Sequence, residues 1–273
     1  MEQRRVDHVI ATPHAWVVLA GLLLVGLLAA TPGCGDDSGG DVDAASADAG
    51  ADVADLPSDG STPDTGADGG VEVPLDGFGE ISGTCGFLDE VVWSGSGSVL
   101  FRNAIDLGTA AFDYSALSAG GQEVWDDGNL GGNSLHSEVF AYEVLYRCEL
   151  ADLLKTEGEI IYVDPGGKKT DLLVTIDGRR VGVSVTRAYY FPPGPLPFAD
   201  AYNLLVDKCG DILLSADNAD PADAWERSML HVIAYDAEHA DVIETAYATL
   251  EATLVEDTLL VVTVTDGNDD YIY

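Results

Sequence analysis

The stretch TDLLVTIDGRRVGVSVTRAYYF, residues 170–191, decides the fold of this chain. Two runs rich in Val, Ile and Leu flank Asp177-Gly178, and an Asp-Gly pair between such runs is among the strongest short-range signals for a β-hairpin. The sequence therefore predicts two antiparallel strands joined by a tight turn.

The length of the turn fixes which residues face one another across the hairpin. A two-residue turn pairs Ile176 with Arg179 and Asp171 with Ser184, whereas a turn two residues longer pairs Asp171 with Thr186. In both registers Asp171, Ser184 and Thr186 share one face, because successive side chains of a strand point to opposite faces.

Periodic segments on both sides of the hairpin predict an α/β fold, with a central mixed sheet and flanking helices. Apolar residues at helical spacing predict helices over 134–155, 198–212 and 237–254. Apolar runs bounded by turn formers predict strands at 159–164, 170–176, 180–191, 228–236 and 258–267. The core order is helix, three strands, helix, strand, followed by a further helix and strand. A strand-like region over 81–114 predicts an N-terminal β-hairpin before this core.

This element order resembles the core of the PD-(D/E)XK superfamily, the restriction-endonuclease-like fold, over Ser134 to Tyr235. The resemblance implies that a Glu on the first helix, an Asp at the start of the second strand and an acid-x-Lys on the third strand converge on metal ions. In such sites carboxylates hold magnesium, which stabilises the charge that develops on a phosphate.

The resemblance assigns the Asp position to Asp171 and the helix acid to Glu138 or Glu143. We expect Asp171 to face Ser184 or Thr186 beneath the first helix. The chain departs from the family pattern on the third strand, where Ser184 replaces the acid and Thr186 replaces the Lys. Arg187, Lys168, Lys169 or Lys208 are the basic residues close enough in sequence to substitute.

We therefore expect a nuclease-like body with a degenerate site, no bound metal, no other cofactor and no enzymatic activity. On this interpretation the body has a binding or structural role. The alternative is a metal-dependent nuclease or phosphodiesterase that works with a degraded site.

The charge of the chain makes nucleic acid an improbable partner. Its 273 residues include 12 Lys and Arg against 48 Asp and Glu, which gives a formal net charge of −36. A surface this acidic repels phosphate backbones. Seven basic residues nevertheless cluster around the predicted strand turns, and they are either solvated charges that protect sheet edges or a contact surface for an anionic partner. These residues are Lys155, Lys168, Lys169, Arg179, Arg180, Arg187 and Lys208.

The N-terminus has the pattern of an export signal. Arg4 and Arg5 precede the uncharged apolar run Ala15–Ala30, and the sequence Thr-Pro-Gly-Cys follows at 31–34. The segment resembles a bacterial lipoprotein leader, which implies cleavage after Gly33 and acylation of Cys34. Thr31 and Pro32 depart from the usual residues of that motif. An uncleaved anchor helix and an ordinary signal with a chance Cys are the alternatives.

Residues 34–80 predict an acidic, disordered tether. They consist mainly of Asp, Ala, Gly, Ser and Pro, and the chain has no Lys or Arg between Arg5 and Arg102. Low hydrophobicity with charge of one sign cannot bury enough apolar surface to offset the entropy of ordering. The sequence thus predicts a signal peptide over 1–33, a lipid-anchored tether over 34–80 and a single domain over 81–273.

This organisation predicts an exported protein, held by acylated Cys34 in the lipid bilayer of a bacterial outer membrane, on its periplasmic or surface face. The body would meet an unknown protein or anionic ligand there. Cys85, Cys148 and Cys209 remain after acylation of Cys34. Either one pair of them forms a disulfide or all three are buried thiols.

Overall fold

The computed structural model describes residues 78–95, 97, 99–108, 112–130, 134–191, 193–255 and 257–267. The predicted leader, the predicted lipidation site at Cys34 and the tether up to residue 77 lie outside these residues. Phe78 is 1% exposed and packs against Phe140. The packed body therefore includes residues that the sequence assigned to the end of the tether.

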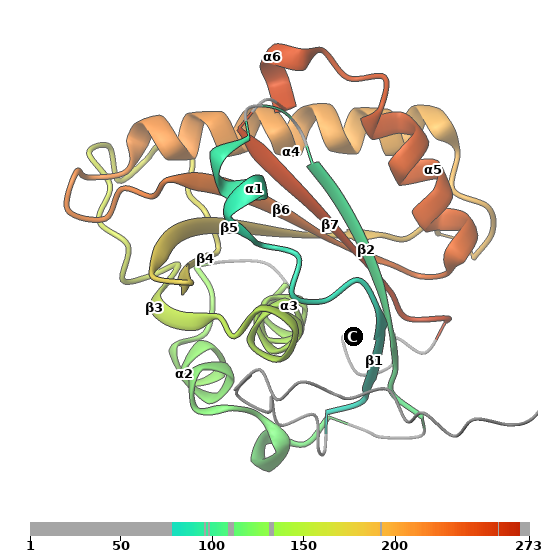
Figure 1. Ribbon diagram of the computed structural model, residues 1–273, viewed down its shortest axis with the longest axis horizontal. Coiled ribbons are helices and arrows are strands. Elements are labelled where there is room, and N and C mark those ends of the chain that lie inside the picture. The colour runs from blue at the N-terminus through green and yellow to red at the C-terminus, as the bar shows by residue number, and fades with distance from the viewer. Residues whose placement is uncertain are drawn as a thin grey trace, which may run out of the picture. The chain divides into compact units, whose positions relative to one another are not determined.

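Within the described residues, seven strands form one mixed sheet in the order β1-β2-β7-β6-β5-β4-β3 (Figure 1). The strands are β1 (Glu80–Gly83), β2 (Val99–Asp106), β3 (Asp152–Thr156), β4 (Leu172–Ile176), β5 (Arg179–Ala188), β6 (Arg227–Ala234) and β7 (Thr258–Val264). Strands β2, β7, β6 and β5 are parallel, whereas β1 at one end and β4 and β3 at the other are antiparallel to their neighbours. The predicted mixed sheet is confirmed.

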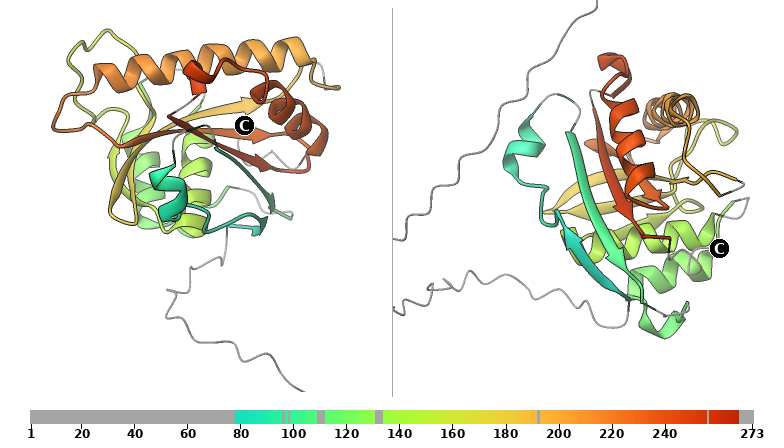
Figure 2. Two further views of the ribbon diagram at one scale, coloured as in Figure 1. Left: turned by 45° about the horizontal axis from the view of Figure 1, so that its top comes forward. Right: turned by 90° about the vertical axis from the view of Figure 1, so that its right-hand side faces the viewer.

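Helices cover both faces of the sheet (Figures 1 and 2). On one face α3 (Leu135–Glu149) crosses the strands with α2 (Ala119–Asp127) beside it, and on the other lie α4 (Phe198–Asn218) and α5 (Ala237–Tyr247). Helix α4 connects β5 to β6, and α5 with the short α6 (Ala252–Val255) connects β6 to β7. The predicted order of helix, three strands, helix, strand is confirmed as α3, β3, β4, β5, α4 and β6.

Alternation along the strands divides the core into two layers. Val181, Val183 and Val185 of β5 belong to the apolar cluster under α3. Ala188 at the end of the same strand belongs to the cluster under α4 and α5. Burial of both faces explains why the central strands are nearly continuous apolar runs rather than alternating ones.

The first strand of the core lies earlier in the chain than the sequence predicted. Helix α3 ends at Glu149 because Leu150 adopts a left-handed conformation with φ 53°. Strand β3 then occupies 152–156, a segment predicted as the end of the helix. The predicted strand at 159–164 is wrong, since its only pairing is the isolated bridge between Tyr162 and Ala219. Leu153 and Leu154 continue the helical apolar spacing, so periodicity alone extended the helix too far.

The region before α3 also differs from the prediction. Strands β1 and β2 are antiparallel, as expected of a hairpin, but the short helix α1 (Glu90–Ser94) lies between them and contains residues predicted as strand. Helix α2 was not predicted, because Gly120 and Gly121 disfavour helices. A Cβ at either glycine would overlap Tyr142 or Glu143 of α3. The glycines therefore permit the close approach of α2 to α3.

Candidate functional site

The hairpin has the shorter of the two predicted registers. Ile176 pairs with Arg179, and the turn residues Asp177 and Gly178 both have positive φ, 51° and 76°. Asp171 lies one residue before β4, whose first residue Leu172 pairs with Val183. Its backbone N–H donates to the Val183 carbonyl at 3.1 Å. Its side-chain Oδ2 accepts the N–H of Val185 at 2.6 Å.

Asp171 lies just before the first residue of β4, where β5 continues beyond its pairing with β4. Strand β4 begins at Leu172, opposite Val183, whereas β5 runs on to Ala188. The Asp171 carboxylate therefore takes the place of a backbone carbonyl and satisfies the first amide beyond the ladder. We call this open end of the hairpin, around Asp171 and Ser184, the notch, and it is the candidate site.

The face of the site is not the one expected from the sequence. Ser184 and Thr186 alternate with the valines that pack under α3, so these two side chains face the side of α4. Ser184 is buried, and its hydroxyl lies 3.3 Å from that of Thr170. The expectation that Ser184 and Thr186 lie beneath the first helix is wrong, because the valines of β5 take that face.

Glu138 reaches the same notch from the first turn of α3. It is 2% exposed, and its Oε1 accepts a hydrogen bond from the Asn129 amide at 3.4 Å. Burial raises the pKa of Glu138 above its ordinary value, while hydrogen bonds from Ser134 and Asn129 oppose the rise. A carboxylate in this position resists ionisation.

Asp171 is the most perturbed acid of the site. Burial raises the pKa of Asp171 to about 7, and the negative charge of Glu138 adds to the rise. The Val185 N–H and the Lys208 ammonium lower this pKa, whereas Glu157 raises it further. Burial therefore favours the protonated form of Asp171 over the ionised form.

Lys208 is the basic residue that the structure adds to the pair of acids. It is half-buried on α4 and lowers the pKa of both Asp171 and Glu138 through its charge. From the sequence, Lys208 is only one of four basic residues that could replace the Lys missing from the third strand. Its place on the second helix distinguishes it from the others, since α4 lies on the face to which Ser184 and Thr186 point.

Glu143 does not belong to this site. Its Oε2 forms a buried ion pair with Arg147 at 2.8 Å. Its Oε1 accepts hydrogen bonds from the backbone and the hydroxyl of Ser118, each at 2.7 Å. Glu143 thus fastens the start of α2 to α3. Glu138 and Glu143 are five residues apart on one helix, which separates their side chains by about 140°.

The residues of the notch do not fit a magnesium ion. Asp171 and Glu138 are two carboxylates with raised pKa values, and Ser184 supplies a neutral hydroxyl where the family pattern requires a third acid. Within the described part of the chain, no three His, Cys, Asp or Glu side chains are arranged to hold a metal. Magnesium prefers ionised oxygen ligands in octahedral geometry, which this donor set does not provide.

Basic residues near the strand turns are largely neutralised by acids. The ion pairs are Lys155 with Asp223 at 2.7 Å, Lys168 with Asp211 at 2.8 Å, Arg179 with Glu226 at 3.2 Å and Arg180 with Asp223 at 3.7 Å. This pairing favours the interpretation of solvated, edge-protecting charges over that of a surface for anions.

A disulfide joins two of the three cysteines whose state the sequence left open. Cys85 is bonded to Cys148 near the end of α3, and Cys209 is a buried free thiol. Burial raises the pKa of Cys209 to about 12, so its reactive thiolate form is suppressed. Next to the disulfide, Glu149 accepts the backbone N–H groups of Gly86, Phe87 and Leu88. Together these bonds fasten the segment after β1 to α3.

A chain of polar side chains that the sequence did not predict crosses three parallel strands under α3. The Thr263 hydroxyl donates to Asn103 Oδ1 at 2.6 Å and lies 2.8 Å from His231 Nε2. Complete burial lowers the pKa of His231 to about 3, so the ring is neutral. Since Thr263 donates to Asn103, it accepts the Nε2–H of His231. These three side chains belong to the core. We expect pH to affect only the stability that they contribute.

Comparisons with known proteins leave the family of the chain open. No protein-family model matches it. The AAC-rich mRNA clone AAC4 protein of Dictyostelium discoideum is 38% identical over 153 residues, which cover 54% of this chain and 22% of that protein. The chain therefore spans about a fifth of the length of this relative. The structure of Pyrococcus furiosus SfsA in complex with Ca²⁺ superimposes with a TM-score of 0.25 and 14% identity, over 48% of this chain and 58% of SfsA. A superposition at this TM-score supports no inference about fold or function.

Proposed function

We propose that the chain is a bacterial lipoprotein whose nuclease-like α/β body binds a partner and does not cleave nucleic acid. The acids at the notch carry this proposal. The charge of Glu138 on the first helix raises the pKa of Asp171 before the second strand, which supports a likeness to the PD-(D/E)XK pattern. Ser184 and Thr186 stand where that pattern has the third acid and the Lys, which supports the absence of catalysis.

The energetics of the notch support a role other than catalysis. Buried carboxylates with raised pKa values are characteristic of acid–base sites, but such a site also needs a nucleophile or a metal within reach. Here the Asp171 carboxylate is bonded to the Val185 amide, and the Ser184 hydroxyl lies beside Thr170. Both groups are therefore already hydrogen-bonded within the fold, where the pairing of β4 with β5 begins.

Export of the chain is supported by the disulfide as well as by the N-terminal sequence. Disulfides persist in oxidising compartments and are rare in the cytosol. The bond between Cys85 and Cys148 therefore agrees with a body that is held outside the cytoplasm by acylated Cys34. An acidic tether would keep such a body away from the anionic membrane surface.

A cleavage assay tests the non-catalytic role. The full chain should leave plasmid DNA and single-stranded RNA intact in the presence of Mg²⁺ or Mn²⁺. Metal-dependent cleavage that Asp171→Asn abolishes would establish the alternative, a nuclease in which Lys208 replaces the missing Lys.

Membrane fractionation tests the anchor. Acyl chains contribute about 0.8 kcal/mol of membrane affinity per buried CH₂, so Cys34→Ser should move the protein from the membrane to the soluble fraction. A Cys34→Ser protein that stays in the membrane with its first residues intact would instead indicate an uncleaved anchor helix.

A further inference from the structure

Helix α4 presents a second apolar row beside the one that it buries. The buried row packs on the sheet and consists of Ala201, Leu205, Cys209, Ile212 and Ser215. The second row repeats every four residues along the helix and consists of Phe198, Tyr202, Val206, Gly210 and Leu214. Phe198 is 47% exposed and Leu214 is 56% exposed. Tyr202 also packs against the core under α4 and α5, whereas Phe198, Val206 and Leu214 are not among the described residues of that cluster and extend the apolar surface beyond what packing on the sheet needs.

Gly210 interrupts the second row at its middle, and the fold gives no reason for a glycine there. A Cβ at Gly210 would meet no neighbouring element within 4 Å. Its backbone has a helical conformation that any residue can adopt, and glycine inside a helix is unfavourable relative to alanine. This differs from Gly120 and Gly121, where the approach of another helix excludes a side chain. The absence of a side chain at Gly210 therefore costs stability without serving the packing of the chain itself.

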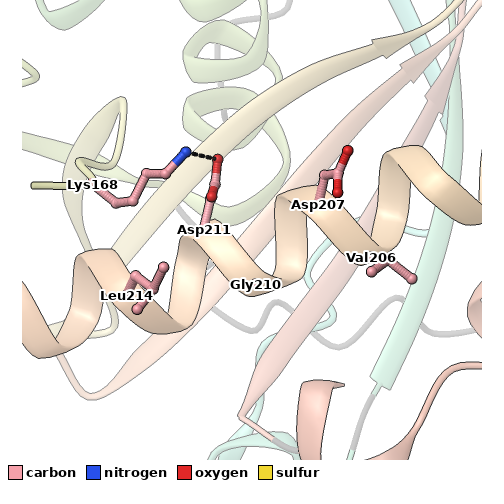
Figure 3. A pocket seen from close by; sticks show the side chains of 6 residues that line it. All are labelled: Lys168, Val206, Asp207, Gly210, Asp211 and Leu214. Carbon is pink, nitrogen blue, oxygen red and sulfur yellow. Dashed lines mark hydrogen bonds and ion pairs between the residues drawn. The ribbon is translucent and has the colours of Figure 1, made fainter.

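The missing side chain leaves a hollow on the outer surface of α4. Figure 3 shows Val206 and Leu214 on either side of Gly210, with the Lys168–Asp211 ion pair along one rim. The hollow has a volume of about 390 Å³, which is large enough to admit one large apolar side chain. Asp207 completes its lining, and Asp211 is held by Lys168 at 2.8 Å.

The charge around the hollow selects the kind of molecule that can occupy it. Helix α4 carries four Asp residues and one Lys: Asp200, Asp207, Asp211, Asp217 and Lys208. Lys168 neutralises Asp211, but Asp207 is exposed and the whole chain has a net charge of −36. A second copy of the chain would bring the same acidic surface to the contact and be repelled. A basic molecule would be attracted, and complementary charge favours both encounter and specificity.

We propose that the outer face of α4 is a docking surface for a basic, amphipathic segment of another protein, which inserts one large apolar side chain at Gly210. Val206 and Leu214 flank that side chain, and Asp207 faces the positive charges of the partner. Recognition of this kind resembles the binding of an amphipathic helix in a groove. The surface is independent of the lipid anchor and of the notch at Asp171.

Fluorescence anisotropy with a labelled peptide tests this docking surface on the full chain. The probe is a synthetic amphipathic peptide of lysine, leucine and one central tryptophan, and its matched counterpart has glutamate in place of lysine. Gly210→Leu fills the hollow, and Ala216→Leu adds the same side chain to an exposed position of α4 about 120° away around the helix axis. Both variants keep the acidic N-terminal region, so attraction of the peptide to that region affects them equally.

We expect the basic peptide to bind the wild type and Ala216→Leu with similar affinity and Gly210→Leu about tenfold or more weakly. The acidic peptide should not bind, and salt should weaken binding of the basic one. Equal binding to Gly210→Leu and Ala216→Leu would overturn the proposal, as would equal binding of the two peptides to the wild type. Concentration-dependent dimers of the wild type that Gly210→Leu removes would also overturn it, because the occupant would then be a second copy of the chain.

Discussion

Asp171 Oδ2 accepts the backbone N–H of Val185 at 2.6 Å, just beyond the first residue pair of β4 and β5, Leu172 with Val183. This hydrogen bond stabilises the ionised carboxylate, yet burial and the charge of Glu138 raise the pKa of Asp171 to about 7. The fold therefore tolerates the protonated form of Asp171 better than the charged form. Glu138, Glu157 and Lys208 are the charged groups that act on it.

Asp171→Asn should stabilise the protein in a pH-dependent way. The pKa of Asp171 is higher in the folded than in the unfolded protein, so its ionisation lowers stability as the pH rises from about 4 to about 7. An amide has no such charge, and its oxygen can still accept the Val185 N–H. We expect the free energy of unfolding to rise by roughly 1–4 kcal/mol at pH 8 and to change little at pH 4.

Urea unfolding of wild type and variant across this pH range measures the effect. Asp217→Asn, which removes an exposed carboxylate from α4, is the matched control and should leave the shape of the pH profile unchanged. A variant that is less stable than the wild type at pH 8 would mean that the charge itself holds the notch together. Lys208 would then be the group that makes the charge favourable.

His231 should give the opposite pH dependence. Burial lowers its pKa to about 3 in the folded protein, below the value of about 6.5 in the unfolded chain. Neutral His231 therefore contributes full stability above about pH 6.5, and this contribution is lost as the pH falls towards 3, by up to about 1.4 kcal/mol per pH unit. Between pH 4 and 6.5 the effects of His231 and Asp171 oppose each other.

Single and double variants separate these two titrations. Asp171→Asn alone should show a steeper loss of stability in acid than the wild type, because His231 then acts unopposed. His231→Gln, whose amide can still donate to Thr263, should lose the acid-dependent component. If the double variant has the same pH profile as Asp171→Asn alone, His231 is not the buried group that titrates.

The disulfide should be a major source of stability. It joins Cys85 to Cys148, with a sequence separation of 63, and the loop-entropy model gives about 4 kcal/mol for a closure of this length. Replacing both cysteines with serine should lower the free energy of unfolding by about that amount. A reducing agent should destabilise the wild type and leave the double variant unaffected. Equal stability of the wild type with and without the reducing agent would show that the bond is absent in solution.

Local signals in the sequence predicted the parts of the fold that depend on local chemistry. Asp177-Gly178 specified the two-residue turn, which in turn set Ile176 opposite Arg179 and Leu172 opposite Val183. The end of α3 could not be predicted in this way, because Leu150 carries no sign of its left-handed conformation and Leu153 continues the apolar spacing. The packing around α3 holds that conformation, with the Ala151 N–H bonded to the Leu145 carbonyl.

Sequence reasoning could predict only those site residues that lie on helices and strands with a clear sequence pattern. Asp171 and Glu138 follow from the hairpin and the first helix, whereas the choice between Glu138 and Glu143 depends on the rotation of α3. The spacing of Glu143 and Arg147, four residues apart, is the signal that would have assigned Glu143 to an ion pair. The contacts of His231 with Thr263 and Asn103 join strands far apart in sequence and have no local signal.

Gly210→Ala should stabilise the protein by about 1 kcal/mol, because alanine favours the helix and the open surface at this position has room for a methyl group. Gly182→Ala provides the contrast. A Cβ at Gly182 would overlap the Trp225 ring, so that variant should be less stable than the wild type. Thermal unfolding of the three proteins measures both effects. A loss of stability in Gly210→Ala would mean that the fold itself requires this glycine, and the hollow on α4 would then be a consequence of packing rather than a surface open to a partner.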